Sequence, residues 1–284
     1  MATFSNQATL TYTGGTALSN IVTGEILETL AVTKTAVGDN YAPGDTITYV
    51  VALTNSGTTA LSGITLSDDL GAYPFETTSL IPLTYVEGSL LYYVNGILQP
   101  TPTVTAGTDL VVTGISVPAG GDAVIVYRAT ANEFAPTGAG GSIQNTVTVT
   151  GGGLAEAITA EETVTALEGT SLTITKDLSP STVPENGVIT YTLTVVNSGN
   201  LPADAADNLS VTDTFLPALS DITVTLDGDV LTEGTDYTYD EATGLFATTQ
   251  GRITVPAATV TQDPVTGAYT TLPGTAVLTV TGNV

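Results

Sequence analysis

Cysteine and histidine are absent from this chain of 284 residues. Without cysteine, the chain can form neither disulfide bonds nor thiolate metal sites. Without histidine, it lacks the commonest general base and the commonest metal ligand of enzymes. The sequence also contains no phosphate-binding loop motif. We therefore expect no turnover enzyme, no cofactor and no metal site.

Positive charge is scarce as well, with four basic residues against 28 acidic ones and a formal net charge of −24. Such a charge repels nucleic acid and anionic lipid and favours solubility. No apolar run reaches the length of a transmembrane helix. The opening residues MATFSNQ lack the basic and apolar regions of a signal peptide. We expect neither a nucleic-acid partner nor membrane insertion. For export, we expect either a signal peptide that has been removed or a route that needs no signal peptide.

Threonine, valine and glycine are abundant, and no long stretch favours helix-forming residues at helical spacing. Short alternating runs between Gly, Pro, Asn and Asp turns are typical of β-strands. The length is that of two domains, each able to bury a core. The composition therefore predicts an all-β protein of two domains.

An internal repeat defines these two domains. Residues 30–57, LAVTKTAVGDNYAPGDTITYVVALTNSG, match residues 172–199, LTITKDLSPSTVPENGVITYTLTVVNSG. Further on, GITLSDDL matches NLSVTDTF, and this match pairs Asp68 with Asp213. The repeat predicts two tandem immunoglobulin-like β-sandwiches.

The two repeats differ in how they end. Repeat 1 continues to a closing strand, IQNTVTVTGGG, whereas repeat 2 stops at VLTVTGNV. A similar strand, NQATLTYTGG, opens the chain, and residues 1–33 resemble residues 141–175 as a unit. A sandwich without a strand exposes an apolar groove and unpaired backbone groups, which a strand from elsewhere can fill. We predict that the first strand of one molecule completes the second domain of its neighbour, a head-to-tail contact that propagates into a filament.

Polar residues occupy matched positions on the strand faces that should be buried. The two lysines of the chain, Lys34 and Lys176, align with each other. Because side chains alternate faces along a strand, both lysines share a face with apolar neighbours, and so do Asp68, Asp213 and Asn145. The predicted donor strand carries one further asparagine, Asn6. Its core-side residues are Phe4, Asn6, Ala8, Leu10 and Tyr12.

Burying an unpaired ammonium or carboxylate costs several kcal/mol, so these residues need an explanation. An intramolecular isopeptide bond is one. Burial lowers a lysine pKa and raises a carboxylate pKa, so that a neutral amine can attack an asparagine amide beside a protonated acid while ammonia leaves. The product is a neutral amide that ties two strands together.

The pattern TK…GDTITYVVALTN…SDDL…QNTVTV resembles the conserved repeat domain of bacterial surface proteins, a large family of unknown function. More broadly, it is similar to the isopeptide-stapled immunoglobulin-like domains of Gram-positive pili and adhesins. The resemblance covers nearly the whole chain. For repeat 1 it implies a Lys34–Asn145 bond with Asp68 as the assisting acid.

In repeat 2, the resemblance matches Lys176 and Asp213, but the asparagine is missing from the repeat. The donor strand would deliver it as Asn6, which implies a bond between subunits. The function implied is a structural subunit of a bacterial extracellular filament, either a pilus-like or a spore-appendage fibre on the cell or spore surface. Its partners would be identical subunits head to tail, with an unknown surface anchor or tip protein, and its only chemistry would be autocatalytic single-turnover bond formation.

The same residues have plainer interpretations. A lysine near a strand end can be a solvated guard of a sheet edge. Asp68 and Asp213 can be turn residues, and Asn6 can belong to a frayed terminus. Asn283 is a rival partner for Lys176.

Other polar residues favour turns. Two asparagines, Asn55 and Asn197, sit in NSG sequences typical of turns. Acidic clusters could suggest calcium, but none reproduces an EF-hand loop, and solvated turns are the better interpretation. The clusters contain Asp39, Asp45, Asp204, Asp207, Asp227, Asp229, Glu233 and Asp236. The alternative function is a monomeric surface adhesin, stalk or calcium-binding module whose own N-terminal strand completes its second domain.

The sequence divides the chain into four segments. They are a donor-strand arm at 1–29, a first sandwich at 30–153, a connecting strand or linker at 154–170, and a second sandwich without its last strand at 171–284. Residues 258–272 are an insertion in repeat 2, where we expect extra hairpin residues.

Overall fold

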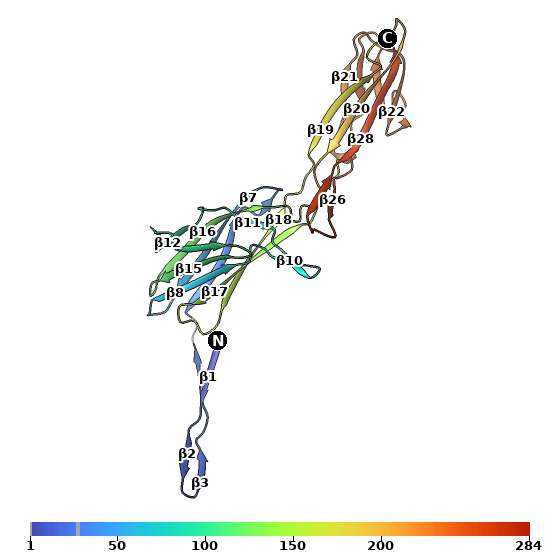
Figure 1. Ribbon diagram of the computed structural model, residues 1–284. Coiled ribbons are helices and arrows are strands. Elements are labelled where there is room, and N and C mark those ends of the chain that lie inside the picture. Colours follow the sequence, from blue (N-terminus) through green and yellow to red (C-terminus); the bar gives the residue numbers. More distant parts are fainter. Residues whose placement is uncertain (1, 27–28) are drawn as a thin grey trace. The chain divides into compact units, whose positions relative to one another are not determined.

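The computed structural model describes residues 2–26 and 29–284, and its regular structure is almost entirely β (Figure 1). Contacts divide the chain into two compact units. Unit 1 contains the chain up to Pro136 together with Ser142–Thr165, and unit 2 contains Thr137–Gly141 and Ala166–Val284. The all-β tandem sandwich fold predicted from the sequence is confirmed. No helix within the described ranges is long and apolar enough to cross a membrane.

Unit 1 consists of two antiparallel sheets. The first has the order β13 (Ile97–Gln99), β12 (Leu91–Val94), β16 (Asp122–Ala131), β7 (Thr46–Asn55) and β5 (Leu30–Val37), with β11 (Leu83–Tyr85) also paired to β16. The second has the order β14 (Thr103–Ala106), β15 (Leu110–Val117), β8 (Leu61–Asp68), β17 (Ser142–Gly151), β18 (Ile158–Ala166) and β6 (Asn40–Tyr41). A small hairpin, β9 (Tyr73–Phe75) and β10 (Thr78–Leu80), lies outside both sheets.

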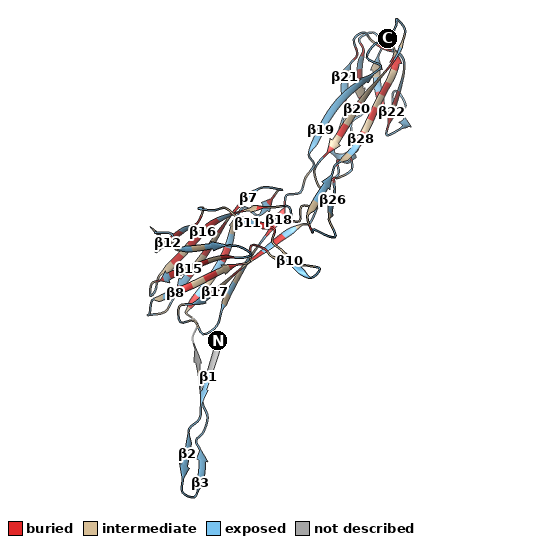
Figure 2. Ribbon diagram, viewed as in Figure 1, coloured by how far each residue is buried: buried red, intermediate tan, exposed pale blue. Residues whose placement is uncertain are grey.

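The core of unit 1 follows from strict alternation along its long strands (Figure 2). In β7, the side chains of Tyr49, Val51 and Leu53 are fully buried, while the residues between them are half-buried. Strand β17 alternates in the same way and lies between β8 and β18. Most of the stretch assigned from the sequence to a connecting strand or linker is therefore β18, which pairs with β17 from Ile158 to Thr165.

Unit 2 repeats the first sheet of unit 1 and only part of the second. Its larger sheet has the order β19 (Leu172–Ser179), β20 (Val188–Asn197), β28 (Gly274–Asn283), β22 (Ser220–Leu226) and β23 (Asp229–Val230). Its smaller sheet has the order β21 (Thr212–Thr214), β25 (Leu245–Thr248) and β24 (Tyr237–Asp240). A 3₁₀ turn at Ala205–Asp207 precedes β21, and the insertion of repeat 2 forms a hairpin of β26 (Thr259–Gln262) and β27 (Tyr269–Leu272).

Strand β21 marks the difference between the two units. Its counterpart in unit 1, β8, pairs with β15 on one side and with β17 on the other. Across the described residues, β21 pairs with β25 alone, so its other edge is open. The inner face of β19 is exposed as well, including Ile174 and Leu178, whose exposed fractions are 52% and 48%.

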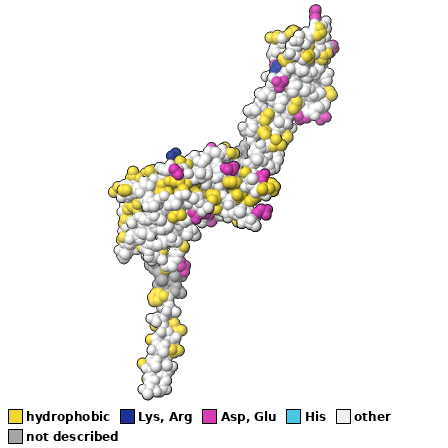
Figure 3. All heavy atoms as spheres, in the orientation of Figure 1, with side chains coloured by type: hydrophobic (Ala, Val, Ile, Leu, Met, Phe, Trp, Pro, Cys, Tyr) yellow, Lys and Arg dark blue, Asp and Glu magenta, His cyan; other side chains and the backbone are white. Residues whose placement is uncertain are grey.

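The N-terminal arm pairs with itself. Strand β1 (Ala2–Asn6) pairs with β4 (Val22–Ile26), and β2 (Thr9–Tyr12) pairs with β3 (Gly15–Leu18). The side chains described in β1, β2 and β3 are all exposed, and hydrophobic ones stand along the arm on the face shown in Figure 3. The sequence predicted a single donor strand, whereas the structure contains a complete hairpin.

Candidate functional site

The lysine, aspartate and asparagine predicted for repeat 1 come together inside unit 1. Lys34 lies on β5 in the first sheet, while Asp68 on β8 and Asn145 on β17 lie in the second. Asp68 is opposite Val147, so Asn145 lies two residues along the neighbouring strand on the same face. The side chains of Lys34 and Asp68 are fully buried, and Asn145 is buried too. A bond between Lys34 and Asn145 would therefore join the two sheets across the core.

A continuous chain of hydrogen bonds links these residues. The Lys34 ammonium donates to Asp68 Oδ2 at 2.6 Å, and the Tyr127 hydroxyl donates to the same oxygen at 2.6 Å. The Asn145 amide nitrogen donates to Tyr127 Oη at 3.2 Å. The second carboxylate oxygen of Asp68 accepts the backbone N–H of Leu70 at 3.1 Å. Asp68 is thus held in place by three donors from three different strands or turns.

Burial shifts the ionisation of these groups in the direction that bond formation requires. Desolvation lowers the pKa of Lys34, although the nearby Asp68 carboxylate opposes that shift. Desolvation raises the pKa of Asp68, against the Lys34 ammonium and the hydroxyl of Tyr127. Burial also raises the pKa of Tyr127 well above its ordinary value. A neutral amine beside a neutral acid is therefore more accessible here than in water.

Two buried oxygens beside this chain remain unpaired. In the part of the chain that the structure describes, Tyr49 Oη and Asn145 Oδ1 are the buried side-chain polar atoms without a hydrogen-bond partner. The Tyr49 ring stacks on Tyr127 with centroids 5.5 Å apart, and the Lys34 nitrogen lies 5.1 Å from its centroid. Attack by an amine would place negative charge on Asn145 Oδ1, and a hydrogen-bond donor would have to reach this atom to stabilise that charge.

The turn after β8 packs closely against β17. Leu70 and Gly71 both have positive φ, 52° and 76°. A Cβ on Gly71 would lie 2.5 Å from Ile143 Cγ2, so a larger residue here would require the Ile143 side chain or the turn to shift. Asp69 also joins this turn to β17, because its Oδ1 accepts the backbone N–H of Thr146 at 2.9 Å.

In unit 2, Lys176 and Asp213 form the matching ion pair. Their side chains are 39% and 16% exposed, compared with zero for both members of the pair in unit 1. The Lys176 nitrogen lies 4.6 Å from the ring centroid of Tyr191 and 5.2 Å from that of Phe215. The site therefore has its lysine, its acid and its aromatic lining, and it faces solvent on one side.

The tyrosine that bridges acid and amide in unit 1 has no counterpart in unit 2. Tyr127 is opposite Tyr49 in the β16–β7 register, and Val280 is opposite Tyr191 in the β28–β20 register. The repeat reveals Tyr49 and Tyr191 as a matched pair, but it gives no signal for Tyr127. Sequence reasoning missed this residue for that reason.

The predicted donor residues lie on the arm, whose strands pair with one another. Asn6 is exposed on β1 and pairs through its backbone with Val22. Phe4, Leu10 and Tyr12 are 57%, 65% and 59% exposed, and Ala8 is exposed as well. Asn6 belongs to unit 1, whereas Lys176 belongs to unit 2.

The asparagines set aside as turn residues do have local roles. Asn55 is fully buried, donates to the carbonyl oxygens of Thr59 and Pro118, and accepts the N–H of Gly57. Asn197 is also buried and makes the matching bonds in unit 2. The rival asparagine, Asn283, donates to Asp221 and lies on β28, which β20 separates from Lys176 on β19.

The acidic clusters are occupied locally. Asp204 and Asp207 cap the 3₁₀ turn, Asp45 accepts the N–H of Ala42, and Asp236 pairs with Arg252 at 2.7 Å. Within residues 2–26 and 29–284, no group of three or more acidic side chains is placed to hold a metal ion.

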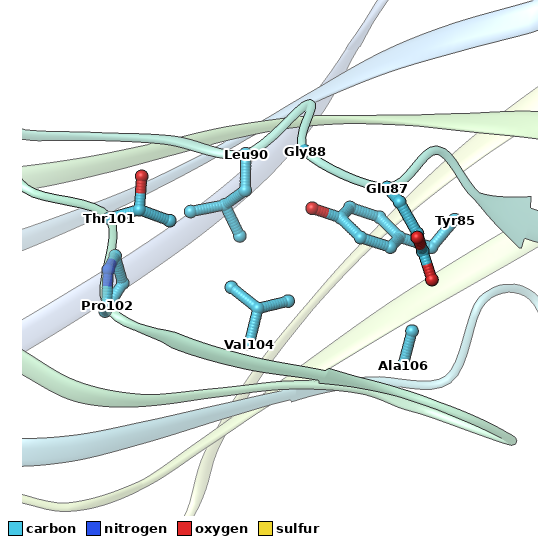
Figure 4. Close-up of a pocket in the computed structure, with 8 residues that line it drawn as sticks. All are labelled: Tyr85, Glu87, Gly88, Leu90, Thr101, Pro102, Val104 and Ala106. Carbon is cyan, nitrogen blue, oxygen red and sulfur yellow. The ribbon is translucent and has the colours of Figure 1, made fainter.

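Unit 1 also has a cavity of about 330 Å³ at the side of its sandwich (Figure 4). Tyr85, Glu87 and Leu90 line one wall, and Pro102, Val104 and Ala106 line the other. None of the sequence-predicted site residues contributes to it, so the candidate chemistry lies elsewhere.

No protein-family model matches the chain, and no curated protein matches its sequence. Solved structures that resemble it include bacterial pilins and an adhesin domain. The major pilin subunit BcpA of Bacillus cereus has 12% identity and a TM-score of 0.36 over 96% of this chain and 73% of that chain. The pilus backbone RrgB of Streptococcus pneumoniae has 14% identity and a TM-score of 0.35, and the match covers 86% of this chain and 55% of that chain. The collagen-binding domain of a Staphylococcus aureus adhesin has 15% identity and a TM-score of 0.31, and the match covers 47% of this chain and 96% of that chain.

Identities and scores of this size carry no conclusion about function. The specific family that the sequence resembles, the conserved repeat domain of bacterial surface proteins, stays a prediction.

Proposed function

We propose that this chain is a structural subunit of a bacterial extracellular filament, in which subunits join head to tail by strand donation and are locked by Lys–Asn isopeptide bonds. The observation that carries the proposal is the open edge of β21 beside Lys176, together with an arm that resembles the missing element. In unit 1 the sheet continues from β8 to β17 and β18; in the described part of unit 2 it stops at β21.

The arm resembles the β17–β18 hairpin in structure as well as in sequence. In both hairpins an asparagine stands on the first strand: Asn145 opposite Glu162, and Asn6 opposite Val22. In both, the second strand leads directly into the first strand of a sandwich, β19 in one case and β5 in the other. The donated element is then the whole hairpin, with its asparagine strand against β21.

The β17–β8 register of unit 1 provides the register that we propose between the arm and β21. Placing Asn6 where Asn145 lies puts Ala8 opposite Asp213, just as Val147 is opposite Asp68. Leu10 then lies opposite Val211, as Val149 lies opposite Leu66. Docking covers Lys176 and Asp213 with apolar side chains and removes the open edge, which favours assembly through backbone pairing and burial.

The chemistry of the joint requires only this chain's residues. The reaction requires Lys176 as a neutral amine, with its proton passed to Asp213. The amine attacks Asn6 Cγ, ammonia leaves, and a neutral amide remains. Covalent joints keep a fibre from slipping apart under load. A surface location and a non-enzymatic role belong to the same proposal, with identical subunits as partners.

Intact-mass analysis of the boiled, denatured assembly tests the proposal. We expect a ladder of covalent oligomers, with one ammonia lost per subunit and one more per joint. Asn6→Ala should abolish the ladder, while Asn20→Ala, which removes another exposed asparagine of the arm, should leave it intact. Lys176→Ala should act like Asn6→Ala, whereas Arg252→Ala, which removes a paired cation from the same unit, should not.

Other outcomes separate the alternatives. A monomer lacking two ammonias would mean that the arm completes its own unit 2, as the adhesin or stalk alternative requires. A non-covalent fibre lacking one ammonia per subunit would restrict the bond to unit 1. Chains that lose no ammonia would refute the isopeptide chemistry.

A further inference from the structure

We propose that the Tyr127 hydroxyl is a catalytic group of the unit 1 reaction, which relays a proton from Asp68 to the departing nitrogen of Asn145. This inference rests on the proposed function, because it assumes that the Lys34–Asn145 bond forms. It adds a residue that neither the sequence repeat nor the resemblance assigns.

The evidence is an unbroken path between the two nitrogens that exchange places on the amide carbon. Lys34 Nζ, the attacking atom, lies 2.6 Å from Asp68 Oδ2, which lies 2.6 Å from Tyr127 Oη. Tyr127 Oη lies 3.2 Å from Asn145 Nδ2, the leaving atom. Among the hydrogen bonds that Asp68 makes within the described residues, none reaches Asn145 directly. The phenol is therefore the link between the acid and the leaving group.

The reaction balances along this path. Lys34 first passes one proton to Asp68, which leaves a neutral amine and a carboxylic acid. The amine attacks Asn145 Cγ; a C–N bond forms and the carbonyl oxygen takes up the electron pair. Tyr127 then gives its proton to Nδ2 and receives the proton of Asp68, so that ammonia leaves as the carbonyl re-forms. Asp68 takes the second proton from the attacking nitrogen and ends as a neutral acid beside a neutral amide.

The surroundings of Tyr127 suit this role. The side chain is fully buried on β16, and its ring is held by stacking on Tyr49. Burial raises its pKa well above the ordinary value, so the group remains a hydroxyl at physiological pH and both receives and gives a proton. A phenoxide would exist only in passing.

Unit 2 provides an internal comparison, because Val280 occupies the position of Tyr127. No relay of this kind is available there, and Asp213 has to reach the leaving nitrogen itself. We therefore expect the bond at the joint to form more slowly than the bond in unit 1.

The test measures how fast unit 1 loses ammonia. Full-length chains carrying Lys176→Ala, so that only the unit 1 bond can form, are made in a short cell-free pulse, and samples are quenched in denaturant and weighed intact. Tyr127→Phe should slow ammonia loss by about 100-fold or more, the usual contribution of a positioned proton-transfer group. Rates are compared per folded molecule, with the folded fraction taken from hydrogen exchange of the β7 and β16 amides.

Tyr92→Phe is the matched control. Tyr92 is another buried tyrosine of unit 1, and its hydroxyl bonds to the backbone of Ser116, away from Lys34. It should react at the parent rate. A Tyr127→Phe chain that reacts at the parent rate, or a Tyr92→Phe chain slowed equally, would overturn the relay and leave the proposed function standing. A parent chain that never loses ammonia would refute the isopeptide part of the proposed function together with the relay, and would leave strand donation standing.

Discussion

Units 1 and 2 contain the same lysine–aspartate pair in opposite surroundings. In unit 1 the pair is sealed between two sheets, and in unit 2 more than a third of the lysine side chain is exposed. The difference lies in the second sheet, since β17 and β18 cover the pair in unit 1, whereas no strand in the described part of unit 2 pairs with the matching edge of β21. A buried ion pair is costly unless every group is satisfied or the charge is removed. An exposed ion pair has little effect on the free energy of unfolding.

The comparison therefore separates a site that is buried within unit 1 from one that, in our proposal, is completed by assembly. Unit 1 contains its own asparagine, its own phenol and a dry environment. Unit 2 contains the lysine and the acid, and the arm contains the asparagine. Each prediction below changes one side of this comparison.

The largest expected effect comes from removing the buried lysine. Lys34→Met keeps the length and apolar stem but removes the cation beside the buried Asp68 and, with it, the proposed cross-link, so unit 1 should lose about 3–5 kcal/mol of unfolding free energy. Lys176→Met in unassembled protein should change the stability of unit 2 by no more than about 1 kcal/mol, because that pair is partly exposed. Calorimetry that resolves the two units would measure both. Equal losses would mean that the two pairs are equivalent and that the difference in exposure is without consequence.

The second effect concerns the joint. Aligning the arm with β17 places Phe4 where Ile143 lies and puts Leu216 where Gly71 lies, next to it. Phe4 is 57% exposed and Leu216 is 80% exposed, and burying one such side chain stabilises by about 1.5–3 kcal/mol. Phe4→Ser should therefore weaken docking by at least tenfold, measured as the subunit concentration needed for assembly.

Val265→Ser is the control for that experiment. Val265 is 86% exposed at the turn of the β26–β27 hairpin, outside the proposed joint. If it weakens assembly as much as Phe4→Ser, the insertion hairpin belongs to the joint and the register proposed here is wrong.

A third, smaller change should affect both units alike. Asn55→Ala and Asn197→Ala remove matched side chains that satisfy loop carbonyl and N–H groups, and each should cost its own unit about 1–3 kcal/mol. Chemical denaturation followed by hydrogen exchange within each unit would measure both losses. A large difference between the two losses would show that the hydrogen bonds of Asn55 and Asn197 do not stabilise the two sandwiches in the same way.

The repeat explains why so much of the site could be predicted from the sequence. Alternation along strands placed Lys34, Asp68 and Asn145 on the core side, and the structure buries all three. The matched lysine and aspartate of repeat 2 also form a pair. These predictions need only the period of a strand and the rule that buried charges require partners.

Two features were out of reach for physical reasons. Tyr127 has no counterpart in repeat 2, so no internal comparison singles it out, and its role depends on packing between sheets. The hairpin form of the arm depends on pairing between residues such as Asn6 and Val22, and single-strand patterns do not encode that register. Residues 27 and 28, within the predicted arm, lie outside the described residues.

The smallest predicted effect is a difference in how acid acts on the two units. Burial raises the pKa of Asp68, so its protonation favours the fold below the ordinary value near 4, and that contribution is lost as the pH rises through the folded-state pKa. In unit 2, the backbone N–H of Thr232 and then Arg252 lower the pKa of Asp236, whose stabilisation is present above the ordinary value and is lost as the pH falls. Lowering the pH from about 6 to about 3 should therefore reduce the melting temperature of unit 2 more than that of unit 1. Asp236→Asn should narrow the gap. Parallel decline of both units in calorimetry would mean that Asp68 titrates as it does in the unfolded chain, which a fully buried carboxylate between two sheets should not do.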